Sequence, residues 1–401
     1  MQTLASAYDQ ISDRALRCPI SEIARIRQEV RKREKQGEKI LDLSSGDIDP
    51  NLRYKGYFNA FSNSIKGAYF YPHAQGMPEL REKIKDSLLQ EGFTKLTLDD
   101  VCVTNGGIQS LDNIAFITPD YNVLMHSPYW APAFNQLVSY DKKVYFTTLT
   151  SNLELDLDHI KKWLKSEYNI GALMINSPNN PTGAIFSKKS LEELTDFAAK
   201  TDKVIIFDEA YHGLVYDQEL DYSPSEFLDL SKSFLVRSFS KSHSLTGHRI
   251  GYVVTTNKTW MKALVNRQLH STSGVSALEQ AALAKLNLTD GIKKIRDAYQ
   301  SKRDELMKLT IVNGFHLQKP PAGGIYLWLK VQIPHYTPVN SRDSYVDNLF
   351  KSFKIPVVGV PGKYFGPFND EFIRLTFSIV PLTDLSLIVK MAQDKFDLKK
   401  A

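Results

Sequence analysis

A run of polar residues around Lys241 is the strongest chemical signal in the sequence. Between Ser238 and Tyr252 the lysine lies among hydroxyl side chains and one arginine, Arg249. A lysine amine can form an imine with an aldehyde, and hydroxyl and guanidinium groups can hold an anion on that aldehyde. Ser238, Ser240 and Arg249 are therefore expected to bind an anionic group next to Lys241.

Two upstream segments supply the other groups that a pyridoxal ring needs. Asp208 closes the apolar run 204–207, as expected at the carboxyl end of a buried parallel strand, and its carboxylate would keep the ring nitrogen protonated. Asn180 and Tyr211 could both hydrogen-bond the ring hydroxyl, which lowers the basicity of the imine nitrogen. We predict pyridoxal 5'-phosphate as the cofactor, with Lys241, Asp208 and Tyr211 as the catalytic residues. Lys241 would act first as nucleophile and then as proton carrier.

The cofactor phosphate needs backbone N–H groups at the start of a helix. The segment after the strand-like run 101–103 meets this need, and we expect the amides of Gly106, Gly107 and Ile108 to donate to the phosphate. Trp130 follows another strand-like run, 123–126, and is predicted to stack on the ring.

Taken together, these segments resemble the pyridoxal-phosphate-dependent aminotransferases of fold type I, the aspartate aminotransferase superfamily of class I/II. The resemblance covers nearly the whole chain and includes Tyr71 with Gly76 and Leu80-Arg81, and the C-terminal segments 321–328, 361–366 and 372–376. It implies that Tyr71 reaches the phosphate of a neighbouring subunit, so that a homodimer with shared active sites is expected. It also implies that Arg374 and the Gly46 backbone N–H bind the substrate α-carboxylate, and Asn180 is a further expected substrate-binding residue.

The resemblance implies an aminotransferase that moves an amino group from an L-α-amino acid to a 2-oxo acid. Another pyridoxal-phosphate reaction stays open, since a carbon–sulfur β-lyase, a cyclopropane-forming synthase and an amino-acid oxidase use the same lysine and aspartate. The motifs do not identify the substrate side chain. Asp47 or Asp49 would favour a cationic side chain if either faced the pocket, although capping a turn is their more ordinary role.

Composition narrows the class of protein. The 401 residues are 42% apolar and 24% charged with a net charge of +5, which is ordinary for a globular protein. No aromatic-basic repeat or zinc-ligand spacing favours nucleic-acid or metal binding. Cys18 and Cys102 are the only cysteines, and neither a signal peptide nor a membrane-spanning run is recognised. We therefore expect a cytoplasmic enzyme whose partners are small molecules, with no metal, nucleic acid or membrane.

Alternating strand-like and helical runs predict an α/β fold. We expect a large domain, residues 50–290, with a doubly wound and mostly parallel sheet, and a smaller α+β domain formed by the N- and C-terminal segments, 1–49 and 291–401. A helix over Ser21–Gln36 should pack on the smaller domain. The strands expected in the large domain are Val101–Thr104, Val123–Ser127, Val144–Thr148, Ala172–Asn176, Val204–Asp208, Ser233–Arg237 and Gly251–Thr255.

Overall fold

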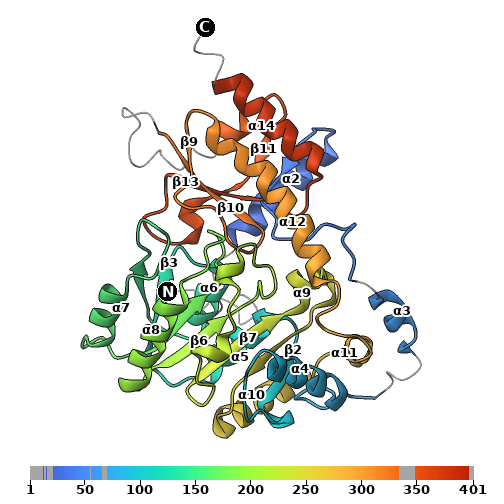
Figure 1. Cartoon of the computed structure of the whole chain (residues 1–401), viewed down its shortest axis with the longest axis vertical. Helices are drawn as coiled ribbons and strands as arrows, with labels where there is room; N and C mark the ends of the chain where they lie inside the picture. Colours follow the sequence, from blue (N-terminus) through green and yellow to red (C-terminus); the bar gives the residue numbers. More distant parts are fainter. Residues whose placement is uncertain are drawn as a thin grey trace, which may run out of the picture.

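The computed structural model describes residues 12, 15, 21–54, 56–65, 70–333 and 348–396 of the chain. Figure 1 shows a large lower lobe and a smaller upper lobe; the C-terminal elements, in orange and red, form most of the upper lobe. The lower lobe contains a seven-stranded sheet with the strand order β2-β8-β7-β6-β5-β3-β4. Its strands are β2 (Val101–Thr104), β3 (Asn122–Ser127), β4 (Val144–Thr148), β5 (Ile170–Asn176), β6 (Val204–Asp208), β7 (Ser233–Ser238) and β8 (Gly251–Val254).

Helices cover both faces of this sheet, because successive side chains of each strand point to opposite faces. Val123 and Met125 of β3 pack in a core with the helices of one face, whereas Leu124 belongs to the core of the other face. The first face carries α5 (Gly107–Ile117), α6 (Ala131–Ser139) and α10 (Lys258–Thr272), and the second α4 (Pro78–Gln90), α7 (Leu157–Leu164) and α8 (Lys188–Lys200). In this sheet only β8 runs opposite to the other six strands, so the predicted mostly parallel, doubly wound sheet is confirmed.

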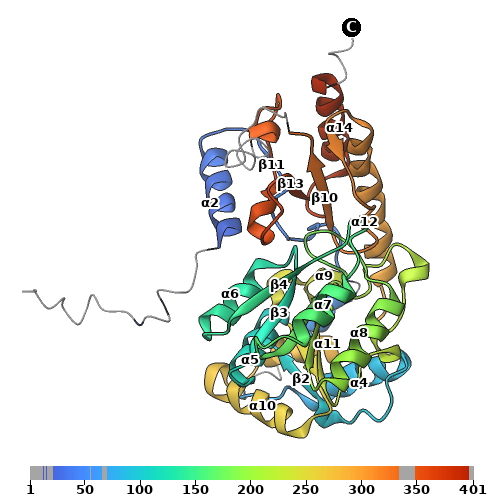
Figure 2. The ribbon, with the colours of Figure 1, turned by 90° about the vertical axis from the view of Figure 1, so that its left-hand side faces the viewer.

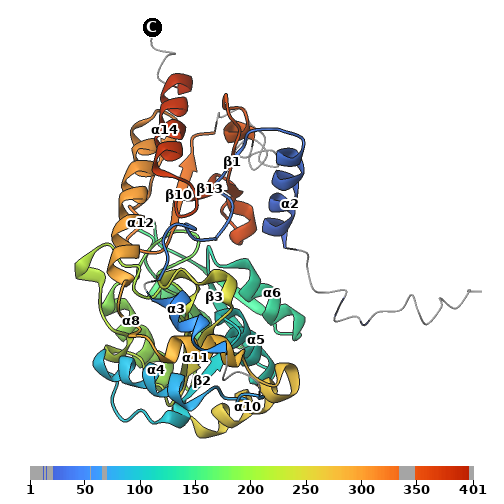
Figure 3. The ribbon, with the colours of Figure 1, turned by 90° about the vertical axis from the view of Figure 1, so that its right-hand side faces the viewer.

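The upper lobe contains elements from both the N-terminal and the C-terminal parts of the chain. Its four-stranded sheet has the order β12-β13-β10-β9, and a separate parallel pair links β1 to β11, with Leu41 opposite Val357. Helix α2 lies on the opposite side of these strands from α12 and α14 (Figures 2 and 3). The elements are α2 (Glu22–Lys35), β1 (Leu41–Asp42), α12 (Ile292–Met307), β9 (Phe315–His316), β10 (Tyr326–Val331), β11 (Val357–Val358), β12 (Val360–Pro361), β13 (Phe372–Thr376) and α14 (Leu382–Phe396).

The N-terminal helix begins as the sequence predicts, since the Ser21 hydroxyl accepts the backbone N–H of Ala24. The described residues also include the short or connecting helices α3 (Tyr57–Ser62), α9 (Phe239–Ser242) and α11 (Ala277–Ala284). The sequence also predicts a helix over 343–353, and residues 343–347 of that stretch lie outside the described residues.

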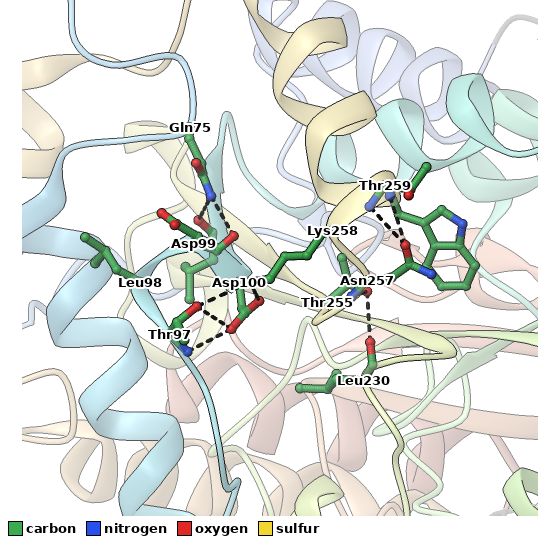
Figure 4. Close-up of polar contacts among 12 residues, drawn as sticks. Gln75, Thr97, Leu98, Asp99, Asp100, Leu230, Thr255, Asn257, Lys258 and Thr259 are labelled. Carbon is green, nitrogen blue, oxygen red and sulfur yellow. Dashed lines mark hydrogen bonds and ion pairs between the residues drawn. The ribbon is translucent and has the colours of Figure 1, made fainter.

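A polar cluster fixes the edge strand β2 to helix α10 (Figure 4). Asp100, which is 1% exposed and directly precedes β2, accepts hydrogen bonds from Thr97 at 2.7 Å and from Lys258 Nζ at 2.7 Å. The Gln75 side chain donates to the carbonyls of Asp99 and Val101, at 2.9 and 3.0 Å. Because β2 leads directly into the start of α5, these contacts also hold the glycine turn at residues 106–107 in place.

Among the described residues, no helix combines the length and apolarity that crossing a lipid bilayer requires.

Candidate active site

A cavity of about 240 Å³ lies where the carboxyl ends of the parallel strands meet the upper lobe. Ligands of open α/β sheets bind at this edge. The structure brings most of the predicted site residues together here: the lining includes Gly46, Gly107, Ile108, Trp130, Asn180, Asp208, Tyr211, Ser238, Ser240, Lys241, Arg249 and Arg374. Of the predicted residues, Gly106 and Tyr71 are not part of the lining.

Lys241 reaches into the cavity from the short helix α9, which follows β7 directly. Its ammonium donates a hydrogen bond to the carbonyl of Gly46, so it links the two lobes. Burial lowers the pKa of Lys241 to about 8, and the positive charges of Arg249 and Arg374 act in the same direction, while Asp47 opposes them. A lowered pKa increases the fraction of neutral amine near pH 7, which is the nucleophilic form.

Asp208 ends β6 and is 3% exposed. One of its carboxylate oxygens accepts the backbone N–H of Ala210 at 3.1 Å, and burial raises the pKa of the carboxyl to about 7. No lysine or arginine in the described part of the chain forms an ion pair with it. A carboxyl group that is buried and has no ion-pair partner ionises readily only when a cation binds next to it.

A chain of hydrogen bonds connects the substrate side of the cavity to Tyr211. Arg374 Nη1 donates to Asn180 Oδ1 at 3.1 Å, Asn180 Nδ2 donates to the Tyr211 hydroxyl at 3.2 Å, and Tyr211 donates to the Tyr326 hydroxyl at 2.9 Å. The pKa of Tyr211 is raised by burial and by Tyr326, so the phenol stays protonated and remains a donor.

Arg374 on β13 is held rigidly. Its Nη2 donates to the Ser44 carbonyl at 2.6 Å, and its guanidinium carbon lies 4.3 Å from the centre of the Tyr326 ring. Within the described residues its buried Nε has no hydrogen-bond partner. This nitrogen is a fixed donor that a planar carboxylate could use.

A group of donors gathers where α5 begins. Gly106 has φ 76°, a left-handed conformation that favours glycine, and a Cβ there would lie 2.7 Å from Arg249 Nη2. The Ser240 hydroxyl receives hydrogen bonds from Ser238 Oγ at 2.9 Å and Arg249 Nη1 at 3.4 Å. Backbone N–H groups, hydroxyls and a guanidinium therefore converge, which is the donor set that phosphate requires.

Some predicted residues lie elsewhere. Tyr71 is 91% exposed and outside the cavity of its own chain. Asp47 accepts from Arg27 at 2.8 Å, and Asp49 accepts from Lys302 Nζ at 2.6 Å. Both acidic side chains are therefore neutralised by a cation of the same chain.

Seven lining residues were not among the predicted site residues: Ser21, Ile23, Leu111, Pro132, Asn176, Ala210 and Tyr326. Asn176 ties two motifs together, because its Nδ2 donates to the Asp208 carbonyl at 3.0 Å and its Oδ1 accepts from Asn180 N at 2.8 Å. The sequence did carry a signal for Asn176, because it is the last residue of the predicted strand Ala172–Asn176 and polar residues at strand ends line such sites. Tyr326 lies in the segment 321–328, which resembles a segment of the aminotransferase family, but the resemblance assigned no role to this tyrosine.

Comparison with known proteins gives a consistent result. An aspartate aminotransferase of Thermotoga maritima is 29% identical over 384 residues, covering 93% of this chain and 97% of the relative. A probable aspartate/prephenate aminotransferase of Rickettsia conorii is 31% identical, covering 86% of this chain and 88% of the relative. The crystal structure of the Thermotoga maritima aspartate aminotransferase superposes with a TM-score of 0.83 at 26% identity, covering 98% of this chain and 100% of that chain. Residues 38–388 match the family "Aminotransferase class I and II". The chain thus belongs to the class I and II aminotransferases, enzymes that move an amino group between an amino acid and a 2-oxo acid.

Proposed function

We propose that the enzyme uses pyridoxal 5'-phosphate, bound in the cavity between the lobes, to transfer the amino group of an L-α-amino acid to a 2-oxo acid. The observation that supports this most directly is Asp208, a buried carboxyl whose pKa is raised to about 7 by burial and which has no cationic partner among the described residues. A protonated pyridine nitrogen is the cation that fits it. The phosphate would lie on the donors at the start of α5, beside Ser240 and Arg249.

When bound, pyridoxal phosphate supplies an electron sink for the carbanion formed at the substrate Cα. The residues of the chain then have separate tasks. Arg374 would hold the substrate carboxylate in one plane, and this orientation decides which Cα bond faces the ring. Asn180 and Tyr211, already hydrogen-bonded to each other, would donate to the ring hydroxyl. Lys241 Nζ, with its pKa lowered to about 8, is suited to take the proton from the substrate Cα and to deliver it to the adjacent carbon of the cofactor. Trp130 would cover the ring and help to exclude water.

We also propose a homodimer in which Tyr71 serves the phosphate of the partner subunit. Tyr71 and its neighbour Phe70 are 91% and 86% exposed, unusual values for aromatic side chains. Exposed apolar side chains on nearby segments, Phe58 at 48% and Ile65 at 51%, add to the surface that a partner would cover.

A cytoplasmic location is the final part of the proposal. Cys102 is a free and fully buried thiol, as expected for a protein that stays in a reducing compartment.

The experiment that tests the cofactor assignment is borohydride reduction of the purified protein loaded with pyridoxal phosphate, followed by peptide mapping. We expect the reduced pyridoxyl group on the peptide that contains Lys241 and its loss in Lys241→Ala. Lys142→Met is the matched control, since Lys142 is also buried but donates to the carbonyls of Thr118 and Pro119. Labelling of any other lysine in the wild type would refute the assignment.

A further inference from the structure

The segment 72–77 joins Tyr71 to helix α4 and belongs to no helix or strand. Gln75 and Gly76 in its middle are nevertheless buried. Buried backbone that is not part of a helix or a sheet needs hydrogen-bond partners from other parts of the chain. Strand β2 meets part of this need, because the backbone N–H of Val103 donates to the Gln75 carbonyl at 2.9 Å.

Two buried glutamines, both 0% exposed, hydrogen-bond the backbone of this segment. Gln268 of α10 donates through Nε2 to the carbonyls of Ala74 and Val103, at 2.5 and 2.6 Å, so it ties the segment to β2. Gln280 of α11 accepts the backbone N–H of Met77 at 2.7 Å through its Oε1. A side chain therefore holds the backbone on each side of the buried residues 75 and 76.

Both glutamines are themselves fixed by further contacts. Gln268 Oε1 accepts a hydrogen bond from Asn113 Nδ2 of α5 at 3.4 Å. Gln280 Nε2 donates to the Val275 carbonyl at 2.8 Å. Gly76 packs closely on Gln280, since a Cβ at Gly76 would lie 3.1 Å from Gln280 Oε1. A buried amide with hydrogen bonds at both its oxygen and its nitrogen is rigid, so the segment rests on a rigid support.

Tyr71 lies at the other end of the segment, and its side chain is 91% exposed. Because packing within its own chain supports this ring so little, the position of the ring depends on the backbone that leads to it. Pro72 restricts that backbone to a φ near −65°, and it lies close to Gly274, where a Cβ would be 3.2 Å from Pro72 Cγ. Ala74, whose carbonyl Gln268 holds, follows Tyr71 by three residues. A binding side chain has to be held within about 0.5 Å of its productive position.

We propose that Gln268 and Gln280 are positioning residues for the active site of the partner subunit, because they hold the segment that carries Tyr71 to the partner's phosphate. This inference rests on the proposed homodimer with shared sites. It assigns each glutamine an effect on the site of the other subunit and none on the site of its own. Gln268→Met keeps the approximate shape and removes the amide, so the dissociation constant for pyridoxal phosphate should rise about tenfold or more, the scale of one hydrogen bond to a charged group.

The first test titrates cofactor-free homodimers with pyridoxal phosphate and with pyridoxal, which has the aldehyde but no phosphate. Gln268→Met and Gln280→Met should weaken the binding of pyridoxal phosphate and leave that of pyridoxal within about twofold. Thr255→Val is the matched control, since Thr255 is 0% exposed and its hydroxyl donates to the Leu230 carbonyl at 2.9 Å, and it should change neither affinity. In a Tyr71→Phe background Gln268→Met should add little, because the hydroxyl that it positions is absent. Equal weakening of both ligands, or full additivity with Tyr71→Phe, would overturn the inference.

The second test uses two hybrid dimers that differ only in which subunit carries Gln268→Met. In both, Lys241→Ala inactivates one site. When Gln268→Met is on the subunit that keeps Lys241, the working site receives Tyr71 from a subunit with native Gln268, and its affinity for pyridoxal phosphate should equal that of the wild type. When Gln268→Met is on the Lys241→Ala subunit, the affinity of the working site should fall about tenfold or more. Equal affinities in the two hybrids, or weaker binding in the first, would overturn the inference.

Failure of the proposed function gives different results. A wild type that does not bind pyridoxal phosphate would refute the proposed function and this inference together, and so would Tyr71→Ala and Lys241→Ala subunits that do not complement each other in respect of the shared site. Complementation of those two variants with equal binding by the two hybrids would show that only the roles of Gln268 and Gln280 are wrong. Gel filtration checks that each variant is a dimer, and Gln280→Met replaces Gln268→Met in the hybrids if the latter does not fold.

Discussion

Replacement of Arg374 by methionine should remove carboxylate recognition while leaving the reacting amine untouched. Truncating one partner of a buried, hydrogen-bonded charge pair costs about 2–5 kcal/mol. At about 1.36 kcal/mol per factor of ten, kcat/KM for an amino acid should fall roughly 30-fold to several thousand-fold. Arg374→Lys keeps the charge but loses the planar fork, so a smaller loss is expected.

The assay compares leucine with 3-methylbutylamine, which has the same side chain but no carboxylate. The amine should lose much less than leucine, because Arg374 has no group to bind on it. Loss of Arg374 also leaves the Ser44 carbonyl and Asn180 Oδ1 without their donor, so urea unfolding must accompany the kinetics. Arg267→Met is the control, since Arg267 lies over Phe116 at 4.3 Å, the distance that separates Arg374 from Tyr326. Equal losses for leucine and its amine would show that Arg374 supports the fold or the cofactor instead.

Three further outcomes are expected. In cofactor-free protein, burial raises the pKa of Asp208 to about 7, so the folded state holds a proton that the unfolded state releases, and stability falls as the pH rises from about 4 to 7. Asp208→Asn should therefore stabilise the protein at pH 8 and not at pH 4, and the same difference at both pH values in urea unfolding would contradict this. Burial opposes ionisation of Asp100, but hydrogen bonds from Lys258 and Thr97 lower its pKa, so Asp100→Asn should reduce the free energy of unfolding by about 1–3 kcal/mol at pH 7 and by less as the pH falls below about 4. Lys258→Met should reduce it by less, because Lys258 is 65% exposed, and equal losses for the two variants in chemical unfolding would argue against the burial of Asp100 as the cause. Mixing inactive Tyr71→Ala and Lys241→Ala subunits should restore one working site per heterodimer, and sedimentation that gives a monomer, or no recovery after verified subunit exchange, would exclude shared sites.

Much of the large sheet could be predicted because its strands are apolar runs that end at polar residues. The bounds of β2, β4 and β6 agree with the prediction, and the last residue of β6 is Asp208 itself. The site residues of the lower lobe could be located for the same reason, since parallel strands bring their carboxyl ends to one edge.

Contacts between distant segments could not be predicted in this way. Tyr326 becomes a site residue only because it lies against Tyr211, 115 positions earlier in the chain. Asp49 was a candidate for binding a cationic substrate until the structure showed Lys302, 253 positions away, as its partner. Neither contact leaves a periodic pattern in the sequence, because each needs tertiary packing: Tyr326 meets Tyr211 where the two lobes pack together, and Asp49 meets Lys302 where the N-terminal segment packs on α12.

The pairing of β1 with β11 has a consequence for synthesis on the ribosome. Leu41 pairs with Val357, so the N-terminal strand emerges long before its partner has been translated. The separation of 357 − 41 = 316 residues corresponds to roughly 15–65 s at about 5–20 residues per second. The glycine turn, Asp208 and Lys241 all emerge within that interval. On the proposed assignment, the residues expected to bind the phosphate and the ring are therefore translated before Arg374, the residue expected to bind the carboxylate, which follows Val357.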